Sequence, residues 1–451
     1  MMTGRKKQIT WGRRRWASGC TGLAAAIATV VFPTATAAHA ANVTCDTVDL
    51  INAINTANSG GDNVLNLTSY CLYNLTAQIT PEDGLPIITA PNLIIHGNNA
   101  TIRRDPAASD TFRIFDIAAG GALHLDHLTT MGGNASSAGG IYVQGNGVLT
   151  ADTVTVQGNS GGGLKVDDSG QATLTDSRIN DNTSNLGGGI NNDGAVSLTR
   201  VTVDGNRASN QGGAVNADGT NETLDITDSV IKNNTSGEFG GGLDPDNGIV
   251  TITRTRILDN RARLYGGAMF TNAQSTTITG STISGNSTTA TRNDGGGGGG
   301  LWIRGNTAIS DSFITNNRVV GETGLGGGIE HNSDNLVLSN TTVTGNLLSG
   351  RYSAGGGINN EDGSSLSIFG STIDSNKVTG TGSFAAGIHN EDLSPVSMTN
   401  SFVRNNIAPN APAPGGIWTD IQFIPAFGNT ITGNTPTNCL LSPVIVTGCV
   451  G

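Results

Sequence analysis

Residues 187–206 read GGGINNDGAVSLTRVTVDGN, and residues 355–376 repeat the same plan as GGGINNEDGSSLSIFGSTIDSN. Each stretch opens with glycines and an isoleucine, continues through a short alternating run, and ends with an aliphatic residue placed three positions before an asparagine. The aliphatic residue after the glycines recurs at Ile141, Leu164, Ile190, Val215, Leu243, Met269, Leu301, Ile329, Ile358, Ile388 and Ile417. The terminal asparagine recurs at Asn134, Asn159, Asn182, Asn206, Asn234, Asn260, Asn286, Asn317, Asn346, Asn376, Asn406 and Asn434. A period of about 23–32 residues is typical of stacked repeats.

Each period contains three short runs with strand-like alternation and no helical periodicity. Glycine and asparagine suit the bends between such runs because both adopt positive φ at low cost. The repeats therefore predict an all-β chain: a single right-handed parallel β-helix of about twelve three-strand rungs, with aliphatic columns inside. Right-handedness follows from the rule for parallel crossovers. The regular repeats occupy residues 103–420.

The ends of a solenoid need cover, because open edges pair with other chains. Residues 41–102 are predicted to form an N-terminal cap and the first, irregular rungs. The cap begins with a helix from Asp46 to Asn58, with Asp46 as N-cap and Gly60 ending it. Residues 421–451 are predicted to form the C-terminal cap.

Residues 1–40 have the layout of a signal peptide, cleaved after Ala40. Six cations precede a short apolar run and the small-residue site Ala38-His39-Ala40, and no later segment is apolar enough to span a bilayer. We therefore expect a secreted, extracellular protein; the general secretory route and the twin-arginine route both remain open. Removing six of the 24 cations leaves 18 against 35 carboxylates, a formal charge of −17, which argues against nucleic-acid binding.

Four cysteines remain after residue 40, namely Cys45, Cys71, Cys439 and Cys449. In an oxidising compartment an even number of cysteines predicts disulfides. Of the three connectivities that four cysteines allow, the pairs Cys45–Cys71 and Cys439–Cys449 require no contact between opposite ends of the solenoid. We expect each bridge to fasten one end.

The Gly-Gly-Gly-Ile and Ile-x-x-Asn repeats resemble those of the chlamydial polymorphic outer-membrane proteins. The start around Cys45 and the ending Asn434-Thr-Pro-Thr-Asn-Cys439 resemble bacterial secreted right-handed β-helix repeat proteins of the pectin-lyase-like fold. The resemblance covers about Val43 to Gly451 and concerns motifs that build the fold. This chain has Ile or Val where the chlamydial proteins have Phe, and membrane anchoring through a C-terminal barrel like theirs is not expected. The polygalacturonase motifs of the wider class do not occur in order; Asp167-Asp168 stands alone.

Stacked repeats allow the outer surface to be read as columns. The residue after each aliphatic of the glycine cluster should point outward, as should the residue two positions further on. In the later rungs these columns, together with long insertions after each asparagine, predict a loop-walled face. Exposed aromatic rings beside amides and carboxylates suit a sugar. The candidate substrate-binding residues are Trp302, Arg304, Glu330, Asn359, Glu361, His389, Glu391, Trp418 and Asp420.

Carboxylates repeat along the second column at a spacing of about 5 Å, so either they splay into solvent or a cation lies between them. Oxygen ligands of this kind suit Ca²⁺, and the candidate ligands are Glu361, Asp362, Glu391 and Asp392. No cofactor is required by any motif. The alternative for these aspartates is that they simply favour turns.

The sequence thus favours an extracellular, monomeric scaffold that binds a polysaccharide or cell-surface glycan. A polysaccharide lyase or glycoside hydrolase, with carboxylates and Arg304 or His389 as the base, is the alternative. A structural or ice-binding rod is a third hypothesis, based on a column of hydroxyl side chains. That column reads Thr150, Thr175, Thr199, Thr227, Thr253, Thr279, Ser310, Ser339 and Thr399, interrupted by Phe369.

Overall fold

The computed structural model describes residues 40–289, 296–391, 394–421, 424–425 and 427–451. Apart from Ala40, the predicted signal peptide lies outside these residues, and so does Cys20. Residues 40–451 coil into about 14 turns of a parallel β-helix, which confirms the predicted fold class.

Three parallel sheets run along the described chain. The 12-stranded sheet contains β5 (Phe115–Ile117), β7 (Ile141–Val143), β10 (Leu164–Val166), β14 (Ile190–Asn192), β18 (Val215–Ala217), β22 (Leu243–Pro245), β26 (Met269–Thr271), β30 (Leu301–Ile303), β34 (Ile329–His331), β38 (Ile358–Asn360), β42 (Ile388–Asn390) and β45 (Ile417–Thr419). The eight-stranded sheet contains β13 (Thr183–Leu186), β17 (Arg207–Gln211), β21 (Thr235–Ser236), β25 (Arg261–Ala262), β29 (Ser287–Thr289), β33 (Arg318–Val320), β37 (Leu347–Leu348) and β41 (Lys377–Val378).

The large sheet has 27 strands, because most turns contribute two consecutive strands to it. Its strands are β1 (Ala40–Val43), β2 (Val64–Leu67), β3 (Leu72–Leu75), β4 (Leu93–Arg104), β6 (Ala122–Met131), β8 (Val148–Asp152), β9 (Thr155–Gln157), β11 (Gln171–Thr175), β12 (Arg178–Asn180), β15 (Ala195–Thr199), β16 (Thr202–Asp204), β19 (Thr223–Thr227), β20 (Val230–Lys232), β23 (Ile249–Thr253), β24 (Arg256–Leu258), β27 (Ser275–Thr279), β28 (Thr282–Ser284), β31 (Asn306–Ser310), β32 (Phe313–Thr315), β35 (Asn335–Ser339), β36 (Thr342–Thr344), β39 (Ser365–Phe369), β40 (Thr372–Asp374), β43 (Val396–Thr399), β44 (Phe402–Arg404), β46 (Ile424–Pro425) and β47 (Thr430–Thr432).

The predicted inner columns are present. Ile190 pairs in register with Leu164 on one side and Val215 on the other, and all three side chains are buried. The bends between consecutive strands of the large sheet use residues with positive φ, as expected; Asp176, Arg200 and Asp228 hold the same bend in successive turns. One predicted column needs correction: Thr175 pairs with Asp152, so Thr150 belongs to the column of Thr173 instead.

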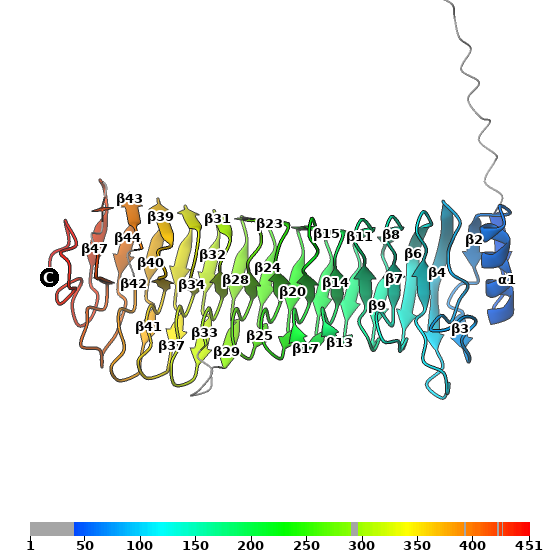
Figure 1. The fold of residues 1–451 in the computed structure, drawn as a ribbon, viewed down its shortest axis with the longest axis horizontal. Coiled ribbons are helices and arrows are strands. Elements are labelled where there is room, and N and C mark those ends of the chain that lie inside the picture. The colour runs from blue at the N-terminus through cyan, green and yellow to red at the C-terminus, as the bar shows by residue number, and fades with distance from the viewer. Residues whose placement is uncertain (1–39, 290–295, 392–393, 422–423, 426) are drawn as a thin grey trace, which may run out of the picture. The chain divides into compact units, whose positions relative to one another are not determined.

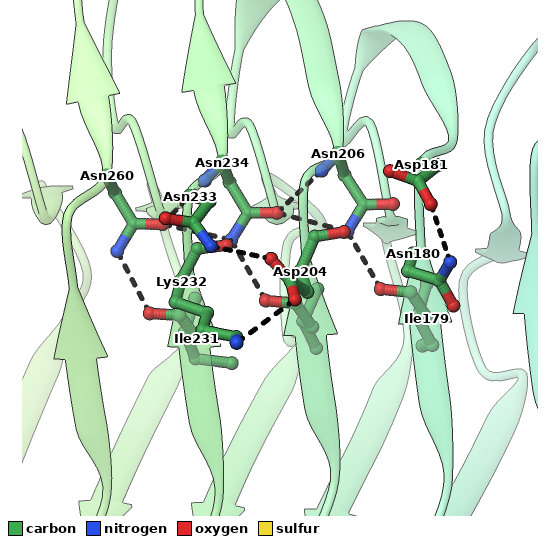
Figure 2. A network of polar contacts seen from close by, with 11 residues as sticks. Ile179, Asn180, Asp181, Asp204, Asn206, Ile231, Lys232, Asn233, Asn234 and Asn260 are labelled. Atoms are coloured by element: carbon green, nitrogen blue, oxygen red, sulfur yellow. Dashed lines mark hydrogen bonds and ion pairs between the residues drawn. The ribbon is translucent and has the colours of Figure 1, made fainter.

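The recurring asparagines form a buried ladder along the axis (Figure 2). The backbone N–H and the side-chain amide of Asn206 both donate to Oδ1 of Asn234, at 2.9 and 3.0 Å. Asn234 donates in the same way to Oδ1 of Asn260, at 3.0 and 2.9 Å. Each amide also donates to a strand carbonyl, as Asn206 does to Ile179 at 2.9 Å. One side chain per turn therefore satisfies three backbone or side-chain groups at a corner that excludes water.

The predicted N-terminal capping helix is present, and Figure 1 shows it and the C-terminal segment at opposite ends of the stacked turns. Helix α1 (Thr47–Asn58) starts at Asp46, whose carboxylate accepts from the N–H of Val48 at 2.7 Å. Its buried face includes Leu50 and Ile54. Disulfides join Cys45 to Cys71 and Cys439 to Cys449, which confirms the predicted pairing. The segment 421–451 adds strands β46 and β47 to the large sheet before it closes the end. Among the described helical residues, no stretch is long and apolar enough to cross a membrane.

Candidate functional site

The second residues of the strands in the 12-stranded sheet stack in register, as the sequence predicted. Trp302 pairs with Glu330, Glu330 with Asn359, Asn359 with His389, and His389 with Trp418. The expectation that these side chains are exposed is wrong for most of them. Trp302, Glu330, Asn359 and His389 are buried, and only Trp418 is half-buried.

The physical reason is that the segments before the glycine clusters fold over this face. Bridges run in parallel through Phe239, Tyr265, Gly297, Leu325, Ala354 and Phe384, one residue for each turn. The ring of Tyr265 lies 4.0 Å from that of Trp302, and a Cβ at Gly297 would lie only 2.7 Å from Cζ3 of Trp302. The ring of Phe384 lies 5.8 Å from that of His389 and 5.7 Å from that of Trp418. The loop wall predicted beside this column therefore covers it.

Beneath this cover, the later turns hold a connected polar network. The amide of Asn359 donates to Glu330 at 3.1 Å and to Glu361 at 3.0 Å. Nδ1 of His389 lies 2.7 Å from Oδ1 of Asn359 and serves as the donor, because a carbonyl oxygen can only accept. The imidazole stacks on Trp418 with ring centroids 4.5 Å apart.

Burial is the largest cause of the pKa shifts of Glu330 and His389 in this network. It raises the pKa of Glu330 well above the usual range of a glutamate, and the charges of Glu361 and Glu391 raise it further. Burial also lowers the pKa of His389 to about 3. A neutral, covered imidazole that donates its proton to an amide is poorly placed to act as the catalytic base considered from the sequence.

The remaining predicted residues lie at the outer margin of the same network. Arg304 donates from Nε to Asn332 at 3.3 Å, and Asn332 donates to Glu361 at 3.0 Å and to Asp362 at 2.8 Å. Asp420 is exposed beyond Trp418. Of the predicted Ca²⁺ ligands, Asp392 lies outside the described residues. In the described part of the chain no group of three or more His, Cys, Asp or Glu side chains is arranged to hold a metal ion. The Ca²⁺ site at Glu361, Asp362, Glu391 and Asp392 stays a prediction.

A cavity of about 280 Å³ opens on the same face two turns earlier. We call it the acidic cavity; its lining residues are Gln211, Asn216, Asp218, Phe239, Asp244, Asp246, Phe270, Asn272 and Arg304. Asn216 and Asp244 are buried in its lining, whereas Asp218, Asn272 and Arg304 are exposed at its margin. Of the predicted site residues, only Arg304 lines it.

Aromatic rings support one side of the acidic cavity. Phe239 and Phe270 stack with centroids 5.2 Å apart, and Phe270 lies 6.4 Å from the buried ring of Trp302. The guanidinium of Arg304 lies 5.9 Å from the centroid of Phe270 and 6.0 Å from that of Trp302. These distances fit cation–π contacts, which hold Arg304 at the margin of the cavity.

Asp244 is the most unusual group in the acidic cavity. Its side chain is 3% exposed, and Oδ2 has no hydrogen-bond partner among the described residues. Burial raises its pKa well above the usual range of an aspartate, and the charges of Asp246 and Asp218 raise it further. An acid that stays protonated beside other carboxylates is frequent at functional sites.

The acidic character continues into the preceding turns. Asp193 shares a hydrogen bond with Asp218, and burial followed by this contact raises the pKa of Asp193. Lys165 lies 3.3 Å from Asp193 and 3.4 Å from Asp167 and partly offsets the charge. A second, more open cavity of about 450 Å³ lies beside Asp193 at the bend that leads into the large sheet.

Asp218, Asp244 and Asp246 stand in the outward-facing columns that the repeats predict, but the repeat pattern does not distinguish them from other turn aspartates. Asp244 is buried, whereas Asp218 in the same lining is exposed. Phe239, just before β22, and Phe270, one turn later, line the cavity together with Asp244. These two aromatic residues are the sequence signal that could have indicated a covered acid.

Comparison with known proteins bears on the fold. Residues 139–308 match the family model described as the right handed beta helix region. This match over part of the chain agrees with the β-helix fold of the described residues. The matched segment contains all three carboxylates of the acidic cavity and ends just beyond Arg304. Neither the curated proteins nor the solved structures gave a significant match. The β-helix fold is compatible with a scaffold and with lyase-like or glycosidase-like proteins.

Proposed function

We propose that this protein is an extracellular glycan-binding scaffold and that a polysaccharide chain occupies the acidic cavity. The observation that carries the proposal is the lining of this cavity, where stacked Phe239 and Phe270 lie beside carboxylates, amides and Arg304. An aromatic face with a few well-placed polar groups suits a sugar ring and its hydroxyls. The signal-like start, the two disulfides and the acidic surface support an extracellular setting.

The regular rise of the turns supports a polymeric ligand. Successive strands in a sheet are about 4.8 Å apart, so the column around Asp193, Asp218 and Asp246 repeats with a spacing comparable to that of a sugar residue. The second cavity beside Asp193 extends the surface away from the acidic cavity. The buried network around Glu330 and Asn359 then supports the margin at Arg304 through Asn332.

A glycoside hydrolase is the second candidate, and Asp244 is the specific observation in its favour. Hydrolysis requires a protonated acid that donates to the leaving oxygen and an ionised carboxylate that activates water or attacks the sugar. Asp244 provides an acid whose pKa is raised, and Asp246 and Asp218 provide neighbouring carboxylates. The monomeric state, the lack of nucleic-acid binding and the ice-binding alternative remain predictions.

A glycan array combined with product assays separates the two candidates. The scaffold proposal expects binding of a polysaccharide without release of reducing ends or unsaturated sugars. Asp244→Asn should weaken that binding. Asp225→Asn, which removes an exposed carboxylate from the large sheet, is the matched control and should leave it unchanged. Release of products that depends on Asp244 would favour the glycoside hydrolase over the scaffold. Failure to bind any glycan would refute both candidate functions.

A further inference from the structure

The acidic cavity carries more negative than positive charge among the described residues that line it. Even without Asp244, whose burial favours the neutral acid, the lining includes two carboxylates, Asp218 and Asp246, and one guanidinium. The guanidinium of Arg304 is held over Phe270 and Trp302 and donates to Asn332. Asp246 accepts a hydrogen bond from an uncharged amide, that of Asn272, at 2.7 Å. The described residues that line the cavity therefore leave part of this negative charge uncompensated.

The unpartnered oxygen of Asp244 indicates where compensation is missing. A buried carboxyl oxygen without a donor is costly, so native structures seldom contain one away from a functional site. Oδ2 of Asp244 is such an atom, and its side chain lines the cavity. A cationic ligand that donates a hydrogen bond to this oxygen would remove the cost, because its charge also favours the ionised form of Asp244.

On these grounds we infer that the bound glycan carries a positive charge, and that the acidic cavity selects an amino sugar with a free, protonated amine. This inference rests on the proposed function and names the class of sugar that the same site would take. An ammonium group has three donors, enough to reach Asp244 and a neighbouring carboxylate together. Charge-assisted hydrogen bonds of this kind are the strong ones.

The stacked rings of Phe239 and Phe270 also favour an amino sugar over other sugars. Phe239 is half-buried, and its ring is stacked on Phe270 at the cavity. The face of an aromatic ring attracts a cation, and it also packs against the apolar face of a sugar. A uronic acid would instead place a carboxylate among Asp218, Asp244 and Asp246, where like charges repel. An N-acetylated sugar keeps its shape but loses the charge.

The test is a comparison of three oligosaccharides of one length by isothermal titration calorimetry at one pH and one ionic strength. The ligands are oligomers of glucosamine, of N-acetylglucosamine and of galacturonic acid, at a pH at which the amine is protonated. We expect the glucosamine oligomer to bind at least about tenfold more tightly than its acetylated counterpart, as one charge-assisted hydrogen bond would give. The galacturonate oligomer should bind most weakly.

Two variants assign the preference to the cavity. Asp244→Asn should weaken glucosamine-oligomer binding about 10- to 100-fold and leave the acetylated oligomer nearly unaffected. Asp246→Asn should also weaken binding of the glucosamine oligomer. Because Asp246 is less buried, this variant keeps the test valid if Asp244→Asn fails to fold. Asp225→Asn removes the same charge from the large sheet and should change neither affinity.

The outcomes separate the two proposals. If the acetylated or the acidic oligomer binds as tightly as the amine-bearing one, the inference of a cationic sugar is wrong while glycan binding stands. If none of the three oligomers and no other glycan binds, the proposed function itself fails. Tight binding of the amine-bearing oligomer that Asp244→Asn and Asp246→Asn leave unchanged would also overturn the inference, because the site would lie elsewhere.

Discussion

Replacing one asparagine of the buried ladder by alanine should destabilise the solenoid far more than its size suggests. Oδ1 of Asn260 accepts from the backbone N–H and the amide of Asn234, at 3.0 and 2.9 Å. Its own amide donates to the carbonyl of Ile231 and to Asn286, both at 3.0 Å. Asn260→Ala removes these four hydrogen bonds and leaves the buried N–H of Asn234 without its acceptor.

The magnitude follows from the number of groups affected. A buried polar group that loses its partner costs about 1–3 kcal/mol, and each further hydrogen bond contributes about 1 kcal/mol. We therefore expect Asn260→Ala to cost about 3–5 kcal/mol. Because repeats contact only their neighbours, the loss should be concentrated in the turns on either side.

Hydrogen exchange measured by mass spectrometry provides a local readout. Peptides that contain Asn234 should exchange at least about 100-fold faster in Asn260→Ala, the factor that corresponds to about 3 kcal/mol. Asn306→Ala is the control: this exposed side chain accepts one hydrogen bond from Asn335, and its loss should change stability by less than about 1 kcal/mol. Equal protection of the Asn234 peptide in the wild type and in Asn260→Ala would refute the reasoning.

Three further predictions follow. Replacing Cys45 and Cys71 by serine should lower the free energy of unfolding of the N-terminal cap by about 3 kcal/mol, and limited proteolysis should then cut near α1 first; uncut α1 would contradict this. Burial raises the pKa of Glu330, so this carboxyl ionises at a lower pH in the unfolded chain than in the folded chain. The free energy of unfolding is therefore unaffected by Glu330 below its unfolded-state pKa and falls as pH rises towards its folded-state pKa. Glu330→Gln should therefore melt higher than the wild type at about pH 8 and at the same temperature at about pH 3, and an equal Tm at both would count against the raised pKa. If Ca²⁺ binds near Glu361 and Glu391, EDTA-treated protein should give heat and a higher Tm on titration with Ca²⁺; no heat and no shift would end that prediction.

The sequence was sufficient for most features that depend on repetition. The columns that include Ile190 and Val215 and the corner asparagines follow from local preferences repeated at a fixed period, which determines their neighbours. The helix after Asp46 followed from its own apolar face and N-cap. Both disulfides followed from the separation of the ends.

The site depended on contacts that the period does not encode. Glu330 and Asp244 stand in a column that was expected to be exposed, but both are buried. The segments that cover this face differ in sequence from turn to turn, with Tyr265 in one turn and Phe384 in another. Thr150 was misplaced for another reason: its strand pairs in regular register, but Asp152 stands where later turns have threonine.

The asparagine ladder also has a consequence for the length of the molecule. The backbone N–H of each ladder asparagine donates to Oδ1 of the asparagine in the next turn. The hydrogen bonds between two neighbouring turns are therefore the same for any pair of turns. Excising residues 207–234 would bring Asn206 against Asn260 with the same pair of donors facing the same acceptor. Whole turns of this kind can therefore be added or removed, so the solenoid could be lengthened or shortened without redesigning either end.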